Sequence, residues 1–341
     1  MPVLSHSRQQ RSKTKTYSFG EWSFGFFSLF CLLLILKNSE IAITYMNQGL
    51  LLCARTVIPS LFPFMVLSEL IVSGGIGKNM LRVIAAPFRH LFALPTAACR
   101  AVLLGWLCGS PIGARCTVLA FSQGELTREE AERTLAVSNN PSSAFLISAV
   151  GVSLWQNRRF GIALYAVVLL SSAITGILLS IPHRKRSQRH RLPREELFLS
   201  PPQTGAKFFS GAVRAASGNM LLVCAYVVFF STLVGTLQLI FTSFGVSETL
   251  AAPLFCLFEL SGGVSRASAL GNTLHAALLC AFAAGWSGLS VHCQVLSVCD
   301  GTALSFRPYF RAKLLQSLLC VLLFCILLHL FPSLTVPAQG I

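Results

Sequence analysis

The sequence predicts an all-α polytopic membrane protein, built of two inverted repeats with re-entrant broken-helix hairpins and preceded by an N-terminal signal-anchor helix. Three observations predict this fold class. The composition is 54% hydrophobic and only 11% charged, whereas soluble domains carry about 25% charged residues. Long stretches contain no charge at all. Two proline-started breaks, at residues 108–115 and 138–143, interrupt sequence that is otherwise suited to lipid.

The charge-free stretches set the number of membrane crossings. They cover residues 160–181, 215–247, 267–299 and 314–341. A helix needs about 20 apolar residues to cross the hydrocarbon core. The chain therefore has room for roughly six to eight crossings.

The positive charge is concentrated in two short segments beside predicted membrane helices. The formal net charge is +15, and ten of the basic residues are Arg8, Arg11, Lys13, Lys15, Arg184, Lys185, Arg186, Arg189, Arg191 and Arg194. Short basic segments next to membrane helices are typical of the cytoplasmic side. We therefore expect a cytoplasmic N-terminus and linker, with contact to anionic lipid headgroups as a second interpretation, and no nucleic-acid partner.

The cysteines and the known catalytic motifs do not indicate chemistry. Most of the twelve cysteines lie inside apolar runs, and the sequence has no Cys-x-x-Cys pair and no Cys/His cluster with zinc spacing. It also lacks a P-loop and a His-Glu-x-x-His motif. We expect no metal, no cofactor and no enzymatic activity.

The chain divides into six segments. The residues that follow the first apolar stretch, Lys37-Asn38-Ser39-Glu40, offer no small-x-small cleavage site, so the first helix is predicted to stay as an uncleaved anchor. The segments are a basic cytoplasmic tail (1–16), the N-terminal transmembrane helix (17–40), the first repeat (41–181), a basic cytoplasmic linker (182–206), the second repeat (207–331) and a C-terminal tail (332–341).

The first repeat is expected to contain one hairpin that enters the membrane without crossing it. A kinked membrane helix over residues 49–72 and an amphipathic helix over residues 80–94 come first. Residues 97–121 follow, but the first break divides them into halves that are too short to span. We expect a re-entrant hairpin there.

The rest of the first repeat begins with a helix whose composition is typical of soluble proteins. Residues 124–138 have mixed charge, and Thr127 with Glu130 forms a capping box at the start of that helix. Two further helices are expected over residues 141–155 and 160–181.

The second repeat shows the same order of features. It begins with an amphipathic segment (207–218) and a crossing (219–244). Two shorter segments follow, each before a break: 251–260 before the break at 261–266, and 270–284 before the break at 285–290. The basic residues Arg307, Arg311 and Lys313 are then expected on the cytoplasmic side, and a final helix covers residues 314–331. In each half a serine lies five residues before an arginine: Ser110 before Arg115, and Ser261 before Arg266. The first long helix of each half is expected to run in opposite directions, which is the arrangement of inverted repeats in alternating-access carriers.

The two proline-started breaks predict where a solute would bind. Ser110 and Asn140 precede Pro111 and Pro141 directly, so each is expected to cap a helix whose first position is proline. Helices that begin halfway across a membrane line a polar cavity, and their positive ends favour anions.

The candidate site residues come from both repeats. The predicted substrate-binding residues are Ser110, Arg115, Asn139, Asn140, Ser142, Ser261, Arg266, Ser287 and His292, and the possible ion-coupling residues are Glu69 and Glu259. Charges at membrane depth are costly and therefore suggest function. Two alternatives remain open: the arginines pair with the glutamates and only fix the fold, and Asn140 only caps its own helix.

Five motifs in this order resemble the YlbJ family of sporulation integral membrane proteins. They are PSLFPFMVLSELIVSGGIG (59–77), GSPIGAR (109–115), QGELTREEAERTLAVSNNPSSAFLISAVG (123–151), FELSGG (258–263) and GWSGLSVHCQ (285–294). The resemblance covers residues 45–331. It implies a Gate-type domain related to the nucleoside-recognition segments of concentrative nucleoside transporters, and a role in endospore formation from the mother cell.

The residues and the resemblance together predict a carrier of a small anionic solute, with dipicolinate as the candidate, across the mother-cell-derived outer forespore membrane. The expected partners are the lipid bilayer, the solute, and a second copy of the chain or other sporulation membrane proteins. A non-transporting scaffold for assembly of the spore envelope and coat, and a nucleoside-type permease, are the alternatives.

Overall fold

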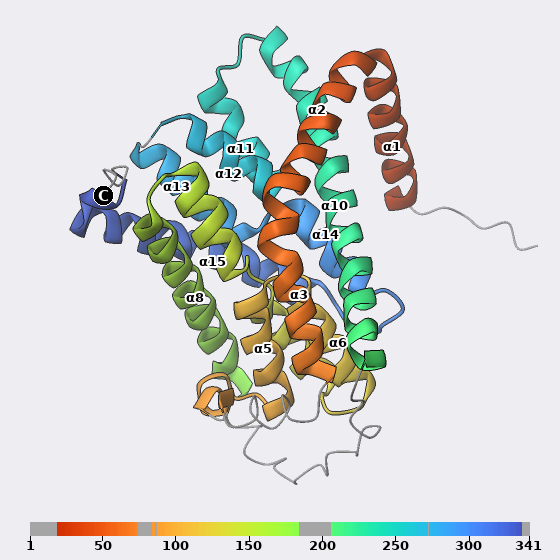
Figure 1. The fold of residues 1–341 in the computed structure, drawn as a ribbon, viewed down its shortest axis with the longest axis vertical. Helices are drawn as coiled ribbons and strands as arrows, with labels where there is room; N and C mark the ends of the chain where they lie inside the picture. Colours follow the sequence, from red (N-terminus) through yellow and green to blue (C-terminus); the bar gives the residue numbers. More distant parts are fainter. Residues whose placement is uncertain (1–18, 74–83, 86, 184–205, 272, 336–341) are drawn as a thin grey trace, which may run out of the picture.

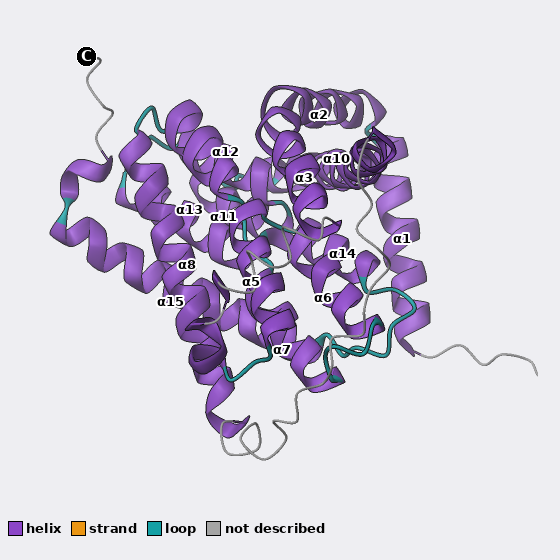
Figure 2. Ribbon diagram, turned by 60° about the horizontal axis from the view of Figure 1, so that its bottom comes forward, coloured by secondary structure: helices purple, strands orange, loops and turns teal. Residues whose placement is uncertain are grey.

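The computed structural model describes residues 19–73, 84–85, 87–183, 206–271 and 273–335, and every regular element within these ranges is helical (Figure 2). The basic tail before residue 17, most of the linker and the last residues of the chain lie outside the described residues. Figure 1 gives the arrangement of the helices.

The first half begins with the predicted N-terminal helix. Its elements are α1 (Phe19–Lys37), α2 (Ser39–Leu52), the π-helical turn η1 (Cys53–Val57), α3 (Ile58–Ser73), α5 (Thr96–Cys108), α6 (Ile112–Ser122), α7 (Arg128–Ser138), the π-helix η2 (Phe145–Leu154), α8 (Arg158–Ser180) and the short turn η3 (Ile181–His183).

The second half begins with one very long helix. Its elements are α10 (Ala206–Ser243), α11 (Glu248–Phe258), α12 (Leu260–Ala269), α13 (Leu274–Trp286), α14 (Gly288–Val298), α15 (Arg307–Leu330) and the short turn η4 (Pro332–Thr335). In both halves one long unit is therefore followed by short helices and then by a long closing helix, α8 in the first half and α15 in the second.

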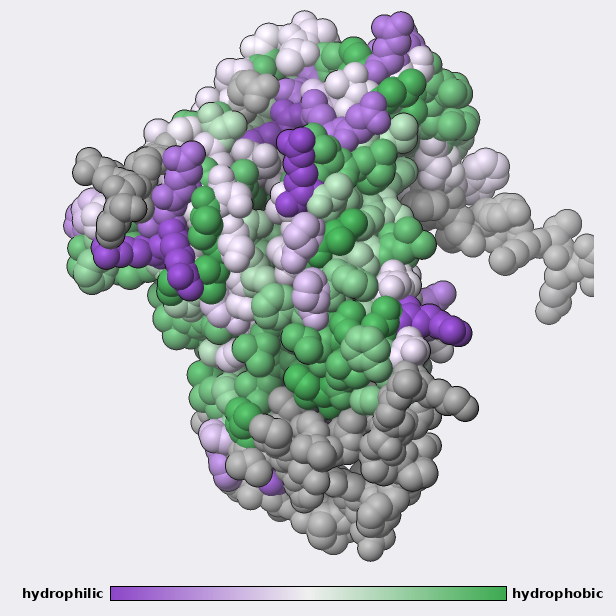
Figure 3. Space-filling model, viewed as in Figure 1, coloured by the Kyte–Doolittle hydropathy of each residue, from purple (hydrophilic) through white to green (hydrophobic). Residues whose placement is uncertain are grey.

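The molecule has the helices and the surface of an integral membrane protein. Among the described residues five helical segments are long and apolar enough to cross a membrane: Ser39–Ile71, Arg158–His183, Phe208–Ser243, Leu274–Val298 and Arg307–Leu330. Large apolar side chains are exposed on these helices, and apolar residues cover the middle of the face in Figure 3. Lipid accommodates such a surface, so the prediction of a helical membrane protein is confirmed.

The two long units lie side by side and run in opposite directions. In Figure 1 the chain descends through α2 and α3 and ascends through α10, and α10 packs along both α2 and α3. Gly235 of α10 allows the close approach, because a Cβ there would overlap the Tyr45 ring of α2.

Four predicted boundaries are wrong. The helix expected to start at residue 49 starts at Ser39, because the chain turns directly after α1 and continues without a break. The amphipathic segment (207–218) and the crossing (219–244) form one helix, α10. The final helix starts at Arg307 instead of residue 314, and the break expected at residues 261–266 lies at Glu259.

The helix that looks soluble, α7, starts with its predicted capping box but is largely buried. Thr127 and Glu130 bond each other's backbone as expected. The second half of α7 packs inside the bundle, where Arg133 donates to the carbonyl oxygens of Phe92 and Ala93. The sequence did not indicate this burial, because the charged residues lie near the start of α7 and most of its apolar residues lie in the later turns.

The end of α7 is held between the two helices of the α5–α6 hairpin. A Cβ placed at Gly105 or Gly113 would overlap the carbonyl oxygen of Ser138. These glycines therefore let the Ser138 carbonyl enter the hairpin and fix where α7 stops.

Replacing either glycine tests this contact. Gly105→Ala and Gly113→Ala force the Ser138 carbonyl out of place, and overpacking of this kind costs about 1–3 kcal/mol. We expect a lower melting temperature in detergent for both variants. Gly211→Ala on α10, where a Cβ meets nothing within 4 Å, should melt at or slightly above the wild-type temperature; equal melting of all three variants would contradict the packing described.

Candidate functional site

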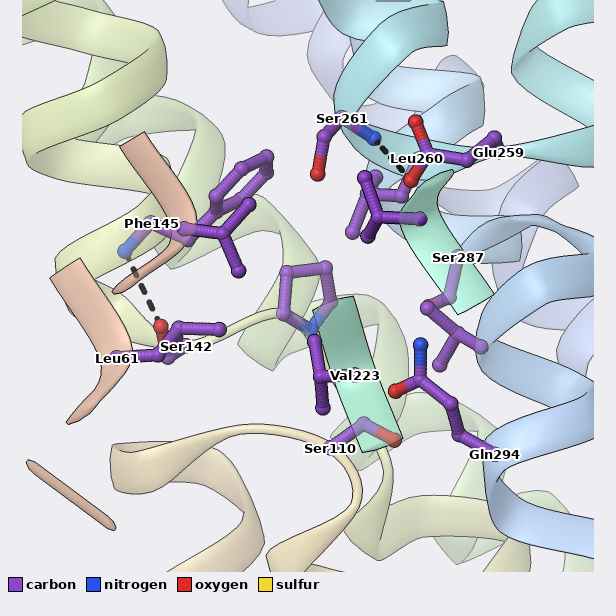
Figure 4. Close-up of a pocket in the computed structure, with 14 residues that line it drawn as sticks. Leu61, Ser110, Ser142, Phe145, Val223, Glu259, Leu260, Ser261, Ser287 and Gln294 are labelled. Atoms are coloured by element: carbon purple, nitrogen blue, oxygen red, sulfur yellow. Dashed lines mark hydrogen bonds between the residues drawn. The ribbon is translucent and has the colours of Figure 1, made fainter. Parts of the chain in front are cut away.

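The candidate site lies where four interrupted helices meet. The interruptions are residues 109–111 between α5 and α6, residues 139–142 between α7 and η2, Glu259 between α11 and α12, and Ser287 between α13 and α14. Each interruption contributes to one pocket of about 40 Å³, shown in Figure 4.

The pocket has six polar side chains in an apolar wall. The polar ones are Ser110, Ser142, Glu259, Ser261, Ser287 and Gln294, and the wall is completed by Val57, Leu61, Pro141, Phe145, Val223, Val227, Leu260 and Val291. The wall residues come partly from η1, α3 and α10, so the long units close the pocket that the interruptions form. Glu259 is the charged member of this set.

Within each half the two interruptions touch through a glycine with positive φ. Gly109 has φ 88°, and a Cβ there would lie 2.8 Å from the backbone nitrogen of Ser142. Gly288 has φ 78°, and a Cβ there would lie 2.9 Å from the backbone nitrogen of Leu260. Glycine provides both the backbone conformation and the space. These contacts bring the two interruptions of each half together.

The first interruption is tied to the second by backbone hydrogen bonds. The Ser110 N–H donates to the Asn140 carbonyl (2.9 Å), and the Ala114 N–H donates to Asn139 Oδ1 (3.0 Å). The Asn139 side chain therefore accepts a hydrogen bond from the first turn of α6. The prediction that Ser110 caps this helix is wrong: its hydroxyl is buried, lines the pocket and has no hydrogen-bond partner in the described structure.

The second interruption begins its helix later than predicted. The Ser142 hydroxyl accepts from the Phe145 N–H (3.1 Å), so Ser142 is the cap and Asn140 is not. Asn140 instead bonds to three helices, α7, α8 and α15: its amide donates to Val137 O and to Ser172 Oγ, and its Oδ1 accepts from Lys313 and Gln316. The proline at position 141 does not start the helix, because residues 139–142 are not helical.

The third interruption is capped by the glutamate that we expected to couple ions. Glu259 is 3% exposed, and its carboxylate accepts from the Ser261 N–H (2.9 Å) and from the Gly262 N–H. A carboxylate at a helix start is stabilised by the free N–H groups and by the helix dipole. Ser261 follows directly and lines the pocket.

The fourth interruption places an unusual serine in the pocket. Ser287 adopts the left-handed conformation with φ 75°, which costs a non-glycine residue about 1–2 kcal/mol. Its hydroxyl is buried without a partner in the described structure. Gln294, two turns further along α14, extends toward the same space as Ser110 in Figure 4.

The predicted arginines do not line the pocket. Arg115 forms an ion pair with Glu69, and Arg266 stacks on the Phe255 ring at 3.7 Å from its centroid. These contacts favour the structural interpretation that the sequence left open. His292 bonds Tyr309 (2.8 Å) behind the pocket wall.

The structure thus brings together Ser110, Ser142, Ser261, Ser287 and Glu259, and it places Arg115, Asn139, Asn140, Arg266, His292 and Glu69 outside the lining. Sequence reasoning missed Lys313 and Gln316. The signal was a polar stripe at helical spacing along α15, formed by Tyr309, Lys313, Gln316 and Ser317. Among the described residues no group of three His, Cys, Asp or Glu side chains is placed to hold a metal ion.

These observations define an integral membrane protein with an internal pocket built from interrupted helices. The chain is a homologue of the sporulation integral membrane protein YlbJ of Bacillus subtilis (strain 168): the two are 28% identical over 320 residues, which is 85% of this chain and 78% of that protein. The resemblance stated from the motifs is confirmed. No family model and no solved structure matches the chain.

The Arg115–Glu69 pair gives a test of the structural interpretation. Arg115→Gln leaves the largely buried Glu69 carboxylate without its partner, which should lower stability by about 1–3 kcal/mol. The exchanged double variant, Glu69→Arg with Arg115→Glu, should recover most of the lost melting temperature in detergent. A double variant that is no more stable than Arg115→Gln would show that the pair is not what holds the two helices.

Proposed function

We propose that this protein is a membrane carrier used in spore formation, which moves a small polar solute through the pocket between the interrupted helices. The first candidate is an anion, dipicolinate, carried across the outer forespore membrane. The observation that carries the proposal is the meeting of four helix interruptions at one pocket. Interrupted helices at membrane depth are typical of carriers, because lipid cannot satisfy the exposed backbone groups but a solute can.

The helix directions support an anionic solute. After each interruption the chain starts a new helix, α6, η2, α12 or α14, so four N-termini lie around the pocket. Their free N–H groups and their dipoles favour negative charge. At α6, η2 and α12 the side chains of Asn139, Ser142 and Glu259 already accept from some of these groups. The start of α14 has no side-chain cap, so its N–H groups are the most open to a solute.

The order of elements supports alternating access. The two halves share the sequence of long, short and long helices, and the long units run antiparallel (Figure 1). Inverted repeats require both features. Alternating access to the pocket would require the hairpins to move relative to the long helices that close it.

A nucleoside-type permease is the second candidate, because the polar lining contains mostly neutral groups. Four serine hydroxyls and the Gln294 amide suit the hydroxyls and the base of a nucleoside, and no arginine or lysine is among the lining residues.

Uptake into proteoliposomes tests the carrier proposal and separates the two solutes. Purified protein should accumulate labelled dipicolinate more rapidly than labelled nucleosides. The reverse preference would favour the permease. Uptake of neither, from protein of normal melting temperature, would favour a non-transporting scaffold and would overturn the proposal.

The unpartnered hydroxyls give a sharper test. Ser110→Ala and Ser287→Ala remove buried hydroxyls that bond nothing in the described protein, so stability should be unchanged or higher. Uptake should fall about tenfold, because each variant lacks a serine hydroxyl that would otherwise form a hydrogen bond with the solute. Ser217→Ala, an exposed serine on α10, is the matched control. Loss of stability together with uptake would point to a structural role instead.

A further inference from the structure

A lysine is buried behind the pocket wall. Lys313 on α15 is 0% exposed, although the sequence placed it at the cytoplasmic surface. Its Nζ donates to Asn140 Oδ1 (3.1 Å) and to Gln316 Oε1 (3.0 Å), both of them neutral amide oxygens. Gln316 Nε2 donates to the same Asn140 oxygen (2.6 Å).

Lys313 has no acidic partner in the part of the chain that the structure describes. The carboxylates that form ion pairs there, Glu69, Glu125, Glu129 and Glu132, pair with other cations. A buried ammonium without a counter-charge is costly. Hydrogen bonds to amides reduce this cost, but they do not balance the charge.

The charge lies directly behind the second interruption. Asn140, which holds the ammonium, is followed by Pro141 and Ser142, and both of these line the pocket. Because the ammonium bonds the residue that directly precedes the lining, its separation from a solute in the pocket is on the order of 10 Å. Glu259 is on the other half's side of the pocket (Figure 4).

We propose that Lys313 makes this pocket select anions, with the carboxylate of the bound solute as the charge that balances its ammonium. Lys313 acts through Asn140 and the second interruption and does not touch the solute, so it is a positioning residue for specificity. The Glu259 carboxylate, which the second half of the chain contributes to the pocket, acts in the opposite direction because it repels anions. The inference rests on the proposed carrier function and assigns its anion preference to Lys313 in place of Arg115 and Arg266.

The size of the effect follows from Coulomb's law. At about 10 Å and an effective dielectric constant of about 20, one positive charge favours each negative charge on the solute by about tenfold. Replacing Lys313 by a neutral residue should therefore weaken the binding of a dianion more than that of a monoanion, and it should not change the binding of an uncharged solute.

The experiment compares solutes of one shape and different charge. Proteoliposomes take up labelled pyridine-2,6-dicarboxylate in competition with the same unlabelled dianion, with pyridine-2-carboxylate or with the uncharged pyridine-2,6-dicarboxamide. The variants are Lys313→Met, Lys313→Gln, which keeps a donor for Asn140, and Lys313→Arg, which keeps the charge. Arg311→Gln, an exposed cation on the same helix, is the control.

Lys313→Met and Lys313→Gln should each lower the preference for the dianion over the dicarboxamide at least tenfold, while Lys313→Arg and Arg311→Gln should keep it. Glu259→Gln should shift the preference in the opposite direction. A purely structural lysine would change total uptake without changing the ratio. An unchanged ratio in a folded Lys313→Gln variant overturns the inference even though the wild type transports; a wild type that moves none of the solutes overturns the proposed function itself.

Discussion

The structure depends on one constraint: a backbone that is interrupted inside a membrane must find partners for its N–H and C=O groups within the protein. Each interruption meets this constraint in its own way. The first uses the Asn140 carbonyl and the Asn139 amide, the second uses the Ser142 hydroxyl, and the third uses the Glu259 carboxylate. Asn139, Ser142 and Glu259 are therefore needed for the fold before any solute is considered.

The same constraint explains which polar groups are free for function. The Asn139 side chain bonds the end of α7 and the start of α6, and the Asn140 side chain bonds the end of α7, α8 and α15. Both residues therefore hold the site and do not form its surface. The hydroxyls of Ser110 and Ser287 form no hydrogen bond in the described structure. A buried group that the fold does not satisfy is the kind of group that a ligand completes.

Sequence reasoning located three of the four interruptions, because glycine, serine and proline inside apolar sequence have a local physical meaning. It misplaced the third by two residues, since Ser261-Gly262-Gly263 looked like the break while the capping carboxylate of Glu259 lies before it. It also assigned the anion site to Arg115 and Arg266. Glu69 is 46 residues before its partner Arg115, and Arg266 lies over the ring of the distant Tyr45 as well as over that of Phe255 on the preceding helix. Such pairings follow from packing that no local pattern reveals.

The length of α10 has a consequence for how the protein sits in its membrane. Its 38 residues extend about 57 Å, whereas a helix tilted by about 40° needs only about 39 Å to pass through the hydrocarbon. The α2–η1–α3 unit beside it is similarly long. Both therefore extend past the hydrocarbon on at least one side. The closing helices α8 and α15, of 23 and 24 residues, extend only about 35 Å, so these shorter helices set the hydrocarbon thickness that suits the protein.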